Sequence, residues 1–137
     1  MENKFSLPVR IYYEDTDAGG VVYNANYIKF LERARTEWLR FHGVEQRALL
    51  EEGYGCVVAN IDITFKRAAK LDDELFVSCD LIELKTASAV FDQRITDKEG
   101  NEFIAAKVKI ASVDLKRMRP VAFLPCFKEV FDKCLLK

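Results

Sequence analysis

The chain has 137 residues, which is enough for one domain and too few for two of ordinary size, so we expect a single domain over residues 1–137. Lysine plus arginine number 21 and aspartate plus glutamate number 22. The net charge of -1 argues against a dedicated nucleic-acid binder, which is usually strongly basic. The longest uncharged stretch, residues 18–28, is too short to span a bilayer. Four cysteines without a Cys-x-x-Cys pair indicate reduced thiols and a cytoplasmic location.

The single histidine, His42, excludes several kinds of catalytic site. A zinc site usually needs several histidines or cysteines at short spacing, and none is present. A Ser-His-Asp triad would have to use His42, yet no serine lies in a Gly-x-Ser-x-Gly turn. The six glycines form no phosphate-binding loop. A hydrolase of this composition would act through carboxylates and backbone N–H groups, and we expect it to need no metal and no organic cofactor.

The first part of the chain predicts a strand, a loop and a long helix. Residues 7–13 are rich in Val, Ile and Tyr, as strands are, and residues 14–22 contain the turn-forming run Asp-Thr-Asp-Ala-Gly-Gly. From residue 26 to residue 41 apolar side chains recur at helical spacing, and Gly43 is a plausible stop. A short helix is predicted over residues 45–52. The positions that define the long helix are Tyr27, Leu31, Ala34, Trp38 and Phe41.

The rest of the chain predicts four consecutive antiparallel strands and a terminal helix. The strands are expected over residues 57–66, 75–81, 89–96 and 102–114, with a hairpin loop over residues 97–101 and a helix over residues 127–135. One helix can cover a whole sheet only if the sheet curls around it. We therefore predict an α+β fold in which a five-stranded antiparallel sheet wraps around a long central helix. The exposed edges of such a sheet favour a dimer.

One segment resembles the signature of a known family. Residues 9–27 read VRIYYEDTDAGGVVYNANY, and this run is similar to the signature of the 4-hydroxybenzoyl-CoA thioesterase family. The likeness is greatest to the YbgC-type acyl-CoA thioesterases that are encoded with the Tol-Pal envelope system. It continues through residues 32–37 and more loosely to Pro120. The resemblance implies the hot-dog fold, an acyl-CoA or acyl-carrier-protein substrate, and a homodimer or a tetramer built as a dimer of dimers. It also implies an active site shared between subunits.

The resemblance places the catalytic acid at Asp17. A carboxylate in a loop just before a helix can act as a general base on water, or it can attack the acyl carbon itself and form an anhydride. The N–H groups at a helix start are unpaired and carry partial positive charge. Those near Asn24 and Ala25 are expected to polarise the thioester oxygen, an effect typically worth about 3–4 kcal/mol in the barrier. By spacing alone, Asp15 and Asp17 would be turn-forming aspartates.

Further residues are expected to bind the substrate. Gly19 and Gly20 leave room for an extended acyl-pantetheine beside the backbone, and Tyr23 is expected to pack the acyl end or the core. The phosphates of coenzyme A call for cations. Four residues at strand ends and in a turn are candidates for binding them, although solvated strand ends explain them equally well: Lys66, Arg67, Lys85 and Ser88.

Asn24 is a departure from the family pattern, because YbgC-type proteins usually carry histidine at this place. Asparagine can form hydrogen bonds but cannot shuttle a proton at neutral pH. A thiol with a pKa near 8.5 leaves readily as thiolate, so hydrolysis remains feasible. Two alternatives stay open. Hydratases of the same fold rely on a histidine in the site, and His42 lies far along the helix. A catalytically weak acyl-CoA-binding or scaffold protein of the envelope lipid machinery is the other alternative, which the retained Asp17 disfavours.

Overall fold

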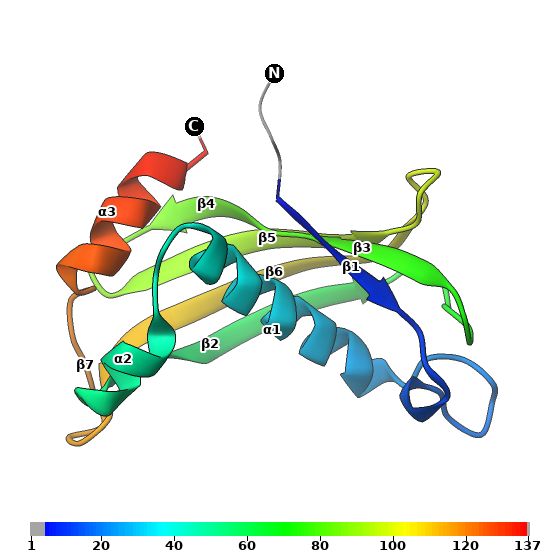
Figure 1. Ribbon diagram of the computed structural model, residues 1–137, viewed down its shortest axis with the longest axis horizontal. Coiled ribbons are helices and arrows are strands. Elements are labelled where there is room, and N and C mark those ends of the chain that lie inside the picture. Colours follow the sequence, from blue (N-terminus) through cyan, green and yellow to red (C-terminus); the bar gives the residue numbers. More distant parts are fainter. Residues whose placement is uncertain (1–4, 137) are drawn as a thin grey trace. The chain divides into compact units, whose positions relative to one another are not determined.

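The computed structural model describes residues 5–136 (Figure 1). These residues form a short 3-10 helix, three α-helices and seven strands. The helices are η1 (Tyr13–Asp15), α1 (Asn24–Phe41), α2 (Gln46–Glu51) and α3 (Pro125–Cys134). The strands are β1 (Ser6–Arg10), β2 (Tyr54–Phe65), β3 (Glu74–Ser78), β4 (Asp80–Leu84), β5 (Ser88–Thr96), β6 (Glu102–Asp114) and β7 (Arg119–Pro120). Hydrogen bonds join them in the order β1-β3-β5-β6-β2, with β4 beside β5 and β7 beside β6.

The residues group into two compact units, and each is described by itself. Unit 1 comprises Met1–Glu37, Ile63–Cys79 and Gln93–Ala106. Unit 2 comprises Trp38–Asp62, Asp80–Asp92 and Lys107–Lys137. Four elements, α1, β2, β5 and β6, contain residues of both units. The single domain predicted from the chain length stays a prediction.

Unit 1 holds the N-terminal strand and the first turns of α1. β1 pairs antiparallel with β3 from Ser6↔Ser78 to Arg10↔Glu74, and Figure 1 shows the two strands side by side. The core is fully buried and apolar, and burial of each large side chain contributes about 1.5–3 kcal/mol. Its members include Ile11, Phe30, Leu31, Leu75, Val77, Ile95 and Ile104. The alternation that predicted β3 and the helical spacing that predicted α1 both come from these side chains.

A buried polar pair ties α1 to the sheet within unit 1. Gln93, which is fully buried, donates through Nε2 to the carbonyl of Leu31 at 3.0 Å and to that of Ser78 at 3.3 Å. Its Oε1 accepts a hydrogen bond from Arg35 Nη1 at 3.0 Å. Burial lowers the pKa of Arg35 below its ordinary value. Since breaking such a network leaves polar groups unpaired, it fixes the position of this part of α1 against β5 and β3.

Unit 2 is built on aromatic side chains. Trp38 meets Phe91 edge to face with ring centroids 5.2 Å apart, and Phe131 of α3 packs on both rings. Figure 1 shows α3 alongside β4. α1 ends at Phe41, and the predicted stop, Gly43, follows it with a φ of +86°. The N–H groups of Gly43 and Val44 donate to the carbonyls of Arg40 and Leu39, the pattern of a Schellman C-cap.

The expected α+β fold with an antiparallel sheet is confirmed, but the sheet has seven strands where five were predicted, and several boundaries differ from the predictions. The first strand ends at Arg10, because the chain turns into η1 where residues 11–13 were expected to continue it. The strand predicted over residues 75–81 is interrupted at Cys79 into β3 and β4. α1 begins at Asn24, two residues before the predicted start, which was missed because Asn24 and Ala25 are exposed and add nothing to the apolar periodicity. α3 begins at Pro125, a residue well suited to a helix start.

β2 is the strand that differs most in burial from the prediction. The alternation of apolar and polar residues predicts a half-buried strand with one wet or interfacial face, yet Val57 and Val58, which point to opposite faces, are 40% and 41% exposed, and Phe65 is 48% exposed. β2 ends the hydrogen-bonded order of strands, so one of its edges pairs with no strand among residues 5–136. The alternation of apolar residues along it therefore does not reflect burial within one chain.

Candidate functional site

The carboxylate of Asp17 lies in a tight turn that its own backbone closes. The N–H of Asp17 donates to the carbonyl of Val21 at 2.9 Å, and the N–H of Gly20 donates to the carbonyl of Asp17 at 3.0 Å. Within the turn, Asp17 Oδ1 accepts a hydrogen bond from the N–H of Gly19 at 2.8 Å. Oδ2 of Asp17 accepts no hydrogen bond from any of residues 5–136. One carboxylate oxygen is thus fixed in place while the other is free to act on a ligand.

The two glycines of this turn have different reasons to be glycine. Gly20 has a φ of +81°, a left-handed conformation that side chains with a Cβ rarely adopt. At Gly19 a Cβ would lie 3.2 Å from Asp17 Oδ1, so a larger residue would crowd the carboxylate at the place where it meets the N–H. Gly20 allows the backbone conformation of the turn, and Gly19 leaves space for the carboxylate of Asp17.

The start of α1 supplies unpaired N–H groups. The N–H groups of Asn24 and Ala25 lie in the first turn, where a helix offers no acceptor, and neither has a partner among the described residues. Both residues are exposed, and the Tyr23 side chain before them is 53% exposed. The N–H of Asn26, in contrast, donates to the carbonyl of Tyr23 at 2.9 Å. Two N–H groups and the positive end of α1 therefore remain available to an oxygen with developing charge.

The segment after β2 packs against the Asp17 loop through Ala69, which is fully buried. Its carbonyl accepts from the N–H of Val22 at 2.9 Å, and its N–H donates to the hydroxyl of Tyr27 at 3.0 Å. Burial raises the pKa of Tyr27, so this hydroxyl stays protonated. Tyr27 thus belongs to the core, and the backbone of residues 66–70 is fixed beside the loop.

The expected phosphate-binding residues fall in two places. Lys66 and Arg67 share unit 1 with Asp17. Lys66 Nζ forms an ion pair with Glu102 at 2.6 Å, and the Arg67 guanidinium lies over the ring of Phe103 at 5.8 Å. Lys85 and Ser88 lie in unit 2, where the N–H of Lys85 donates to the carbonyl of Ser88 at 2.8 Å.

A cavity of about 380 Å³ in unit 2 is lined partly by cations. Lys85 and Lys128 contribute to it beside the apolar side chains of Leu84 and Phe123. Lys128 forms an ion pair with Asp132 at 3.0 Å, whereas Lys85 has no ion-pair partner among residues 5–136. Lys85 is accordingly the candidate cation in unit 2 that is open to a phosphate.

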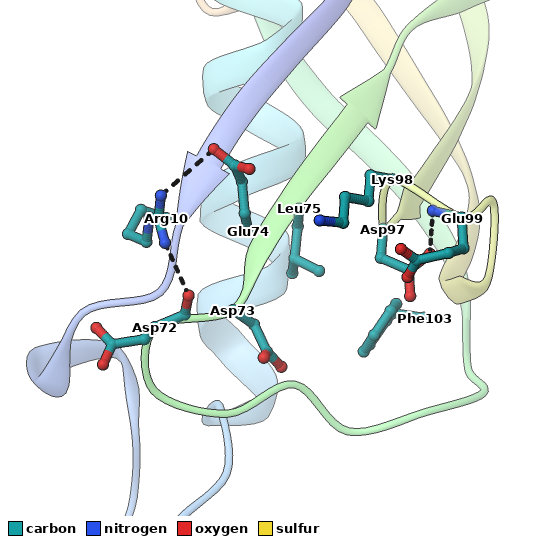
Figure 2. Close-up of a pocket in the computed structure, with 9 residues that line it drawn as sticks. All are labelled: Arg10, Asp72, Asp73, Glu74, Leu75, Asp97, Lys98, Glu99 and Phe103. Atoms are coloured by element: carbon teal, nitrogen blue, oxygen red, sulfur yellow. Dashed lines mark hydrogen bonds and ion pairs between the residues drawn. The ribbon is translucent and has the colours of Figure 1, made fainter.

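A second cavity, of about 330 Å³, lies in unit 1 and was not expected from the sequence. Figure 2 shows it between Arg10 and residues 72–75 on one side and residues 97–99 with Phe103 on the other. Arg10 donates to the carbonyl of Asp72 at 3.0 Å and pairs with Glu74 at 3.4 Å. No residue of the candidate site lines this cavity. Three of its acidic side chains already bond to the protein: Asp73 accepts from the N–H of Lys70, Glu74 pairs with Arg10, and Asp97 accepts from Asn101. Among the described residues no cluster of three or more His, Cys, Asp or Glu is arranged to hold a metal ion.

His42 lies in unit 2 and packs on aromatic rings. Its ring centroid is 4.6 Å from that of Trp38 and 5.1 Å from that of Phe41. The sulfur of Cys134 is 3.6 Å from Nε2 and 3.8 Å from Nδ1. A hydrogen bond in the ring plane would bring one nitrogen much closer than the other, so the sulfur lies over the ring face. Burial lowers the pKa of His42. An imidazole held edge to face against two aromatic rings is a packing residue.

The chain is similar to known thioesterases in sequence and in fold. The sequence pattern of the thioesterase-like superfamily matches residues 11–131. The chain is 49% identical to the acyl-CoA thioesterase YbgC of Haemophilus influenzae over 132 residues, 96% of each chain. A probable thioesterase from Bartonella henselae is 32% identical and superposes with a TM-score of 0.79, covering 89% of this chain and all of that one. Protein SAV2348 of Staphylococcus aureus, solved in complex with CoA, shares the fold with a TM-score of 0.89 at 15% identity, over 100% of this chain and 89% of that one.

The fold and the loop before α1 define a class of enzyme, and the chain belongs to the thioesterase-like superfamily. Its fold is the hot-dog fold, as the resemblance implied. Within this superfamily the chain is of the YbgC type, the group indicated by the run VRIYYEDTDAGGVVYNANY.

Proposed function

We propose that the chain hydrolyses acyl-CoA thioesters, with Asp17 as the acting carboxylate and the N–H groups of Asn24 and Ala25 polarising the carbonyl. The observation that carries the proposal is the half-used carboxylate: Oδ1 of Asp17 is held by Gly19, and Oδ2 is unbonded. Oδ2 is therefore available to a water molecule or to an acyl carbon. The acyl-CoA thioesterase of Haemophilus influenzae, at 49% identity, supports the substrate class.

The chemistry follows from these groups. Oδ2 of Asp17 removes a proton from water as the water oxygen bonds to the thioester carbon, or it bonds to that carbon directly and water then cleaves the anhydride. In either route the carbonyl oxygen gains negative charge, which the two N–H groups stabilise. As the carbonyl reforms, the carbon–sulfur bond breaks and the coenzyme A sulfur leaves as thiolate; in the anhydride route this step comes before the attack of water. Asn24 contributes its backbone N–H and a hydrogen-bonding side chain, but no proton shuttle.

A second copy of the chain supports this site in the proposal. Asp17 is exposed, and it lines neither the two cavities described above nor a third cavity of about 330 Å³ that β1, η1 and the residues Arg33 and Glu37 line in unit 1. An exposed carboxylate is a poor catalyst until another surface excludes water from it. β2 has an unpaired edge with exposed Val57, Val58 and Phe65, so we propose that copies of the chain associate there and complete the cleft. The assembly is a dimer or a dimer of dimers.

Further features of the substrate site are part of the same proposal. Gly19, Gly20 and Tyr23 flank the acyl group. The residues that bind the phosphates of coenzyme A in this proposal are Lys66, Arg67, Lys85 and Ser88. An acyl carrier protein presents the same thioester and is a second possible donor. No helix among residues 5–136 is long and apolar enough to cross a membrane. The cytoplasmic location remains a prediction from the thiols.

One observation favours a second function, an acyl-CoA-binding protein with weak turnover: Asn24 replaces the histidine usual in YbgC-type proteins. The test is to mix the protein with acyl-CoAs of several chain lengths and with an acyl-carrier-protein thioester, and to follow release of free thiol. Catalytic turnover supports the hydrolase. Tight binding of acyl-CoA without turnover overturns it in favour of the binding protein. We expect Asn24→His to change the rate without being required for it.

A further inference from the structure

The buried carboxylate beside the candidate site is Asp15, which the chemistry proposed above does not use. Asp15 is only 6% exposed, yet no cation pairs with it among the described residues. Burying an ionised carboxylate is costly unless hydrogen bonds satisfy it. Both oxygens of its carboxylate accept hydrogen bonds from neutral donors. The elements that carry these donors therefore indicate the role of Asp15.

The two donors come from two different elements. Oδ2 of Asp15 accepts from the N–H of Tyr12 at 2.8 Å, at the entry to η1. Oδ1 accepts from Nδ2 of Asn26, in the first turn of α1, at 2.9 Å. The carbonyl of Asp15 accepts from the N–H of Tyr23 at 2.9 Å. Asp15 therefore binds both ends of the loop that carries Asp17 to each other and to the start of α1.

The loop between these ends is closed like a short hairpin. Thr16 and Val22 form an antiparallel bridge, and the N–H of Asp17 donates to the carbonyl of Val21 at 2.9 Å. These bonds fix the loop internally but do not attach it to α1. The side chain of Asn26 in α1 donates a hydrogen bond to the carboxylate of Asp15, and this bond attaches the loop to the helix. The carboxylate of Asp17 and the N–H groups of Asn24 and Ala25 belong to the two parts that this bond joins.

We infer that Asp15 is a positioning residue, which together with Asn26 holds the Asp17 carboxylate in register with the N–H groups at the start of α1. It does not touch the substrate. The inference rests on the proposed function, since it concerns the geometry of that site. Attack on a thioester carbon requires the carboxylate and the oxygen-binding N–H groups to be correct together. A displacement of about 1 Å can cost about 10²-fold in rate.

The chain contains a matched control for this pair. In the hairpin over residues 97–101, Asp97 Oδ2 accepts from Nδ2 of Asn101, also at 2.9 Å, and Asp97 Oδ1 accepts from two backbone N–H groups. This pair has the same Asp–Asn chemistry but joins no catalytic group. Asp97→Ala should lower the melting temperature without changing kcat. A loss of kcat in Asp15→Ala that exceeds its effect in Asp97→Ala therefore reports positioning, not general stability.

A swap of the two partners makes the test independent of whether Asp15→Ala folds. Asn26→Asp places two carboxylates against each other and should lower kcat. The double variant D15N/N26D restores both bonds with one donor reversed: Asn at position 15 accepts from the N–H of Tyr12 and donates to Asp at position 26. The expected results are a fall in kcat of about 10²-fold for Asp15→Ala, with KM little changed, and recovery of most of kcat in the double variant over Asn26→Asp alone.

Two results would overturn the inference: a parental kcat in a folded Asp15→Ala or in Asn26→Asp, or a double variant no better than Asn26→Asp. Hydrogen exchange gives a readout that does not need turnover. The N–H groups of Gly20 and Gly100 make equivalent bonds of 3.0 Å in their turns. Loss of the Asp15–Asn26 bond should speed exchange at Gly20 and leave Gly100 unchanged. If the parent protein releases no thiol, the proposed function fails, while the exchange experiment still decides the role of Asp15.

Discussion

Two turns in unit 1 have the same backbone and different chemistry. In residues 17–21 and in residues 97–101, an aspartate N–H donates to the carbonyl four residues later, at 2.9 Å and 3.1 Å respectively. In each, a left-handed glycine, Gly20 or Gly100, donates to the aspartate carbonyl at 3.0 Å. In each, the aspartate Oδ1 accepts from the N–H two residues on, at 2.8 Å or 3.0 Å.

The turns differ in what remains for the second carboxylate oxygen. At the last position, the hairpin has Asn101, whose side chain donates to Asp97 Oδ2 at 2.9 Å. The loop has Val21 there, which offers no donor, and Oδ2 of Asp17 stays unbonded. The loop is also bonded to α1 through Asp15. The Asp17 turn thus differs from the hairpin in its free carboxylate oxygen and in its attachment to α1, and not in its backbone.

The largest expected difference between the two turns is in kcat/KM when the aspartate of each turn is replaced by asparagine. Asp17→Asn should lower kcat/KM by about 10²–10⁴-fold, the usual contribution of a general base. Asp97→Asn should leave kcat/KM unchanged, because Asp97 only closes its hairpin. Steady-state release of thiol from an acyl-CoA measures both, with circular dichroism to confirm that each variant is folded. Equal losses in the two variants would show that the turns do not differ as described.

Replacing Val21, the last residue of the Asp17 turn, by asparagine should give Asp17 Oδ2 the hydrogen bond that Asp97 Oδ2 has. Val21→Asn gives the Asp17 turn the donor that Asn101 gives the hairpin. A carboxylate oxygen that accepts a hydrogen bond is a weaker base and nucleophile, and such a bond to a charged group contributes about 1.5 kcal/mol. We expect kcat to fall about 10-fold, with the melting temperature unchanged or raised. Unchanged kcat, together with a structure that shows the new bond, would contradict a role for Oδ2.

The glycines test the shared backbone. A Cβ at Gly20 or at Gly100 meets no atom within 4 Å, so alanine at either place costs only the strain of positive φ, about 1–2 kcal/mol. Urea unfolding should show similar losses of stability for Gly20→Ala and Gly100→Ala. Only Gly20→Ala should also lower kcat, because strain there displaces Asp17. Loss of activity in Gly100→Ala at a temperature where it is folded would count against this separation.

The smallest effect is on acid stability. The Asn101 side chain, and then the N–H groups of Asn101 and Glu99, lower the pKa of Asp97. A folded-state pKa below the unfolded value of about 3.9 stabilises the protein above that pH, and the stabilisation is lost as the pH falls through the folded-state pKa. Asn101→Val should raise the pKa of Asp97 toward its ordinary value, so the variant loses less stability than the parent between about pH 5 and pH 2. Urea unfolding across that range measures the difference, and identical pH profiles would contradict it.

The fold was largely predictable from the sequence, because its elements follow from periodic apolar side chains and turn residues. The stripe from Tyr27 to Trp38 and the alternation in β5 and β6 are buried, as their patterns require, whereas Phe41 at the end of the stripe is 64% exposed. The burial of β2 was not predictable. The same alternation arises whether the partner surface belongs to the chain or to another copy.

The site was predictable only in part. The signature placed Asp17, Asn24 and Ala25 in one short segment, and the structure puts them on a loop and the helix start that follows it. The bond between Asp15 and Asn26 was missed, because residues eleven apart have no fixed spacing in a loop. The only signal was a second aspartate beside the first. Whether Lys66 or Lys85 meets a phosphate depends on which ion pairs form across strands, and no local pattern encodes that.

The most direct test of the central claim is a crystal structure of the Asp17→Asn variant with an uncleaved acyl-CoA bound. The account predicts that the thioester carbon lies about 3–3.5 Å from the side chain at position 17. Its carbonyl oxygen should accept hydrogen bonds from the N–H groups of Asn24 and Ala25. A thioester bound elsewhere, for example in the unit 2 cavity beside Lys85, with the side chain at position 17 facing solvent, would contradict it.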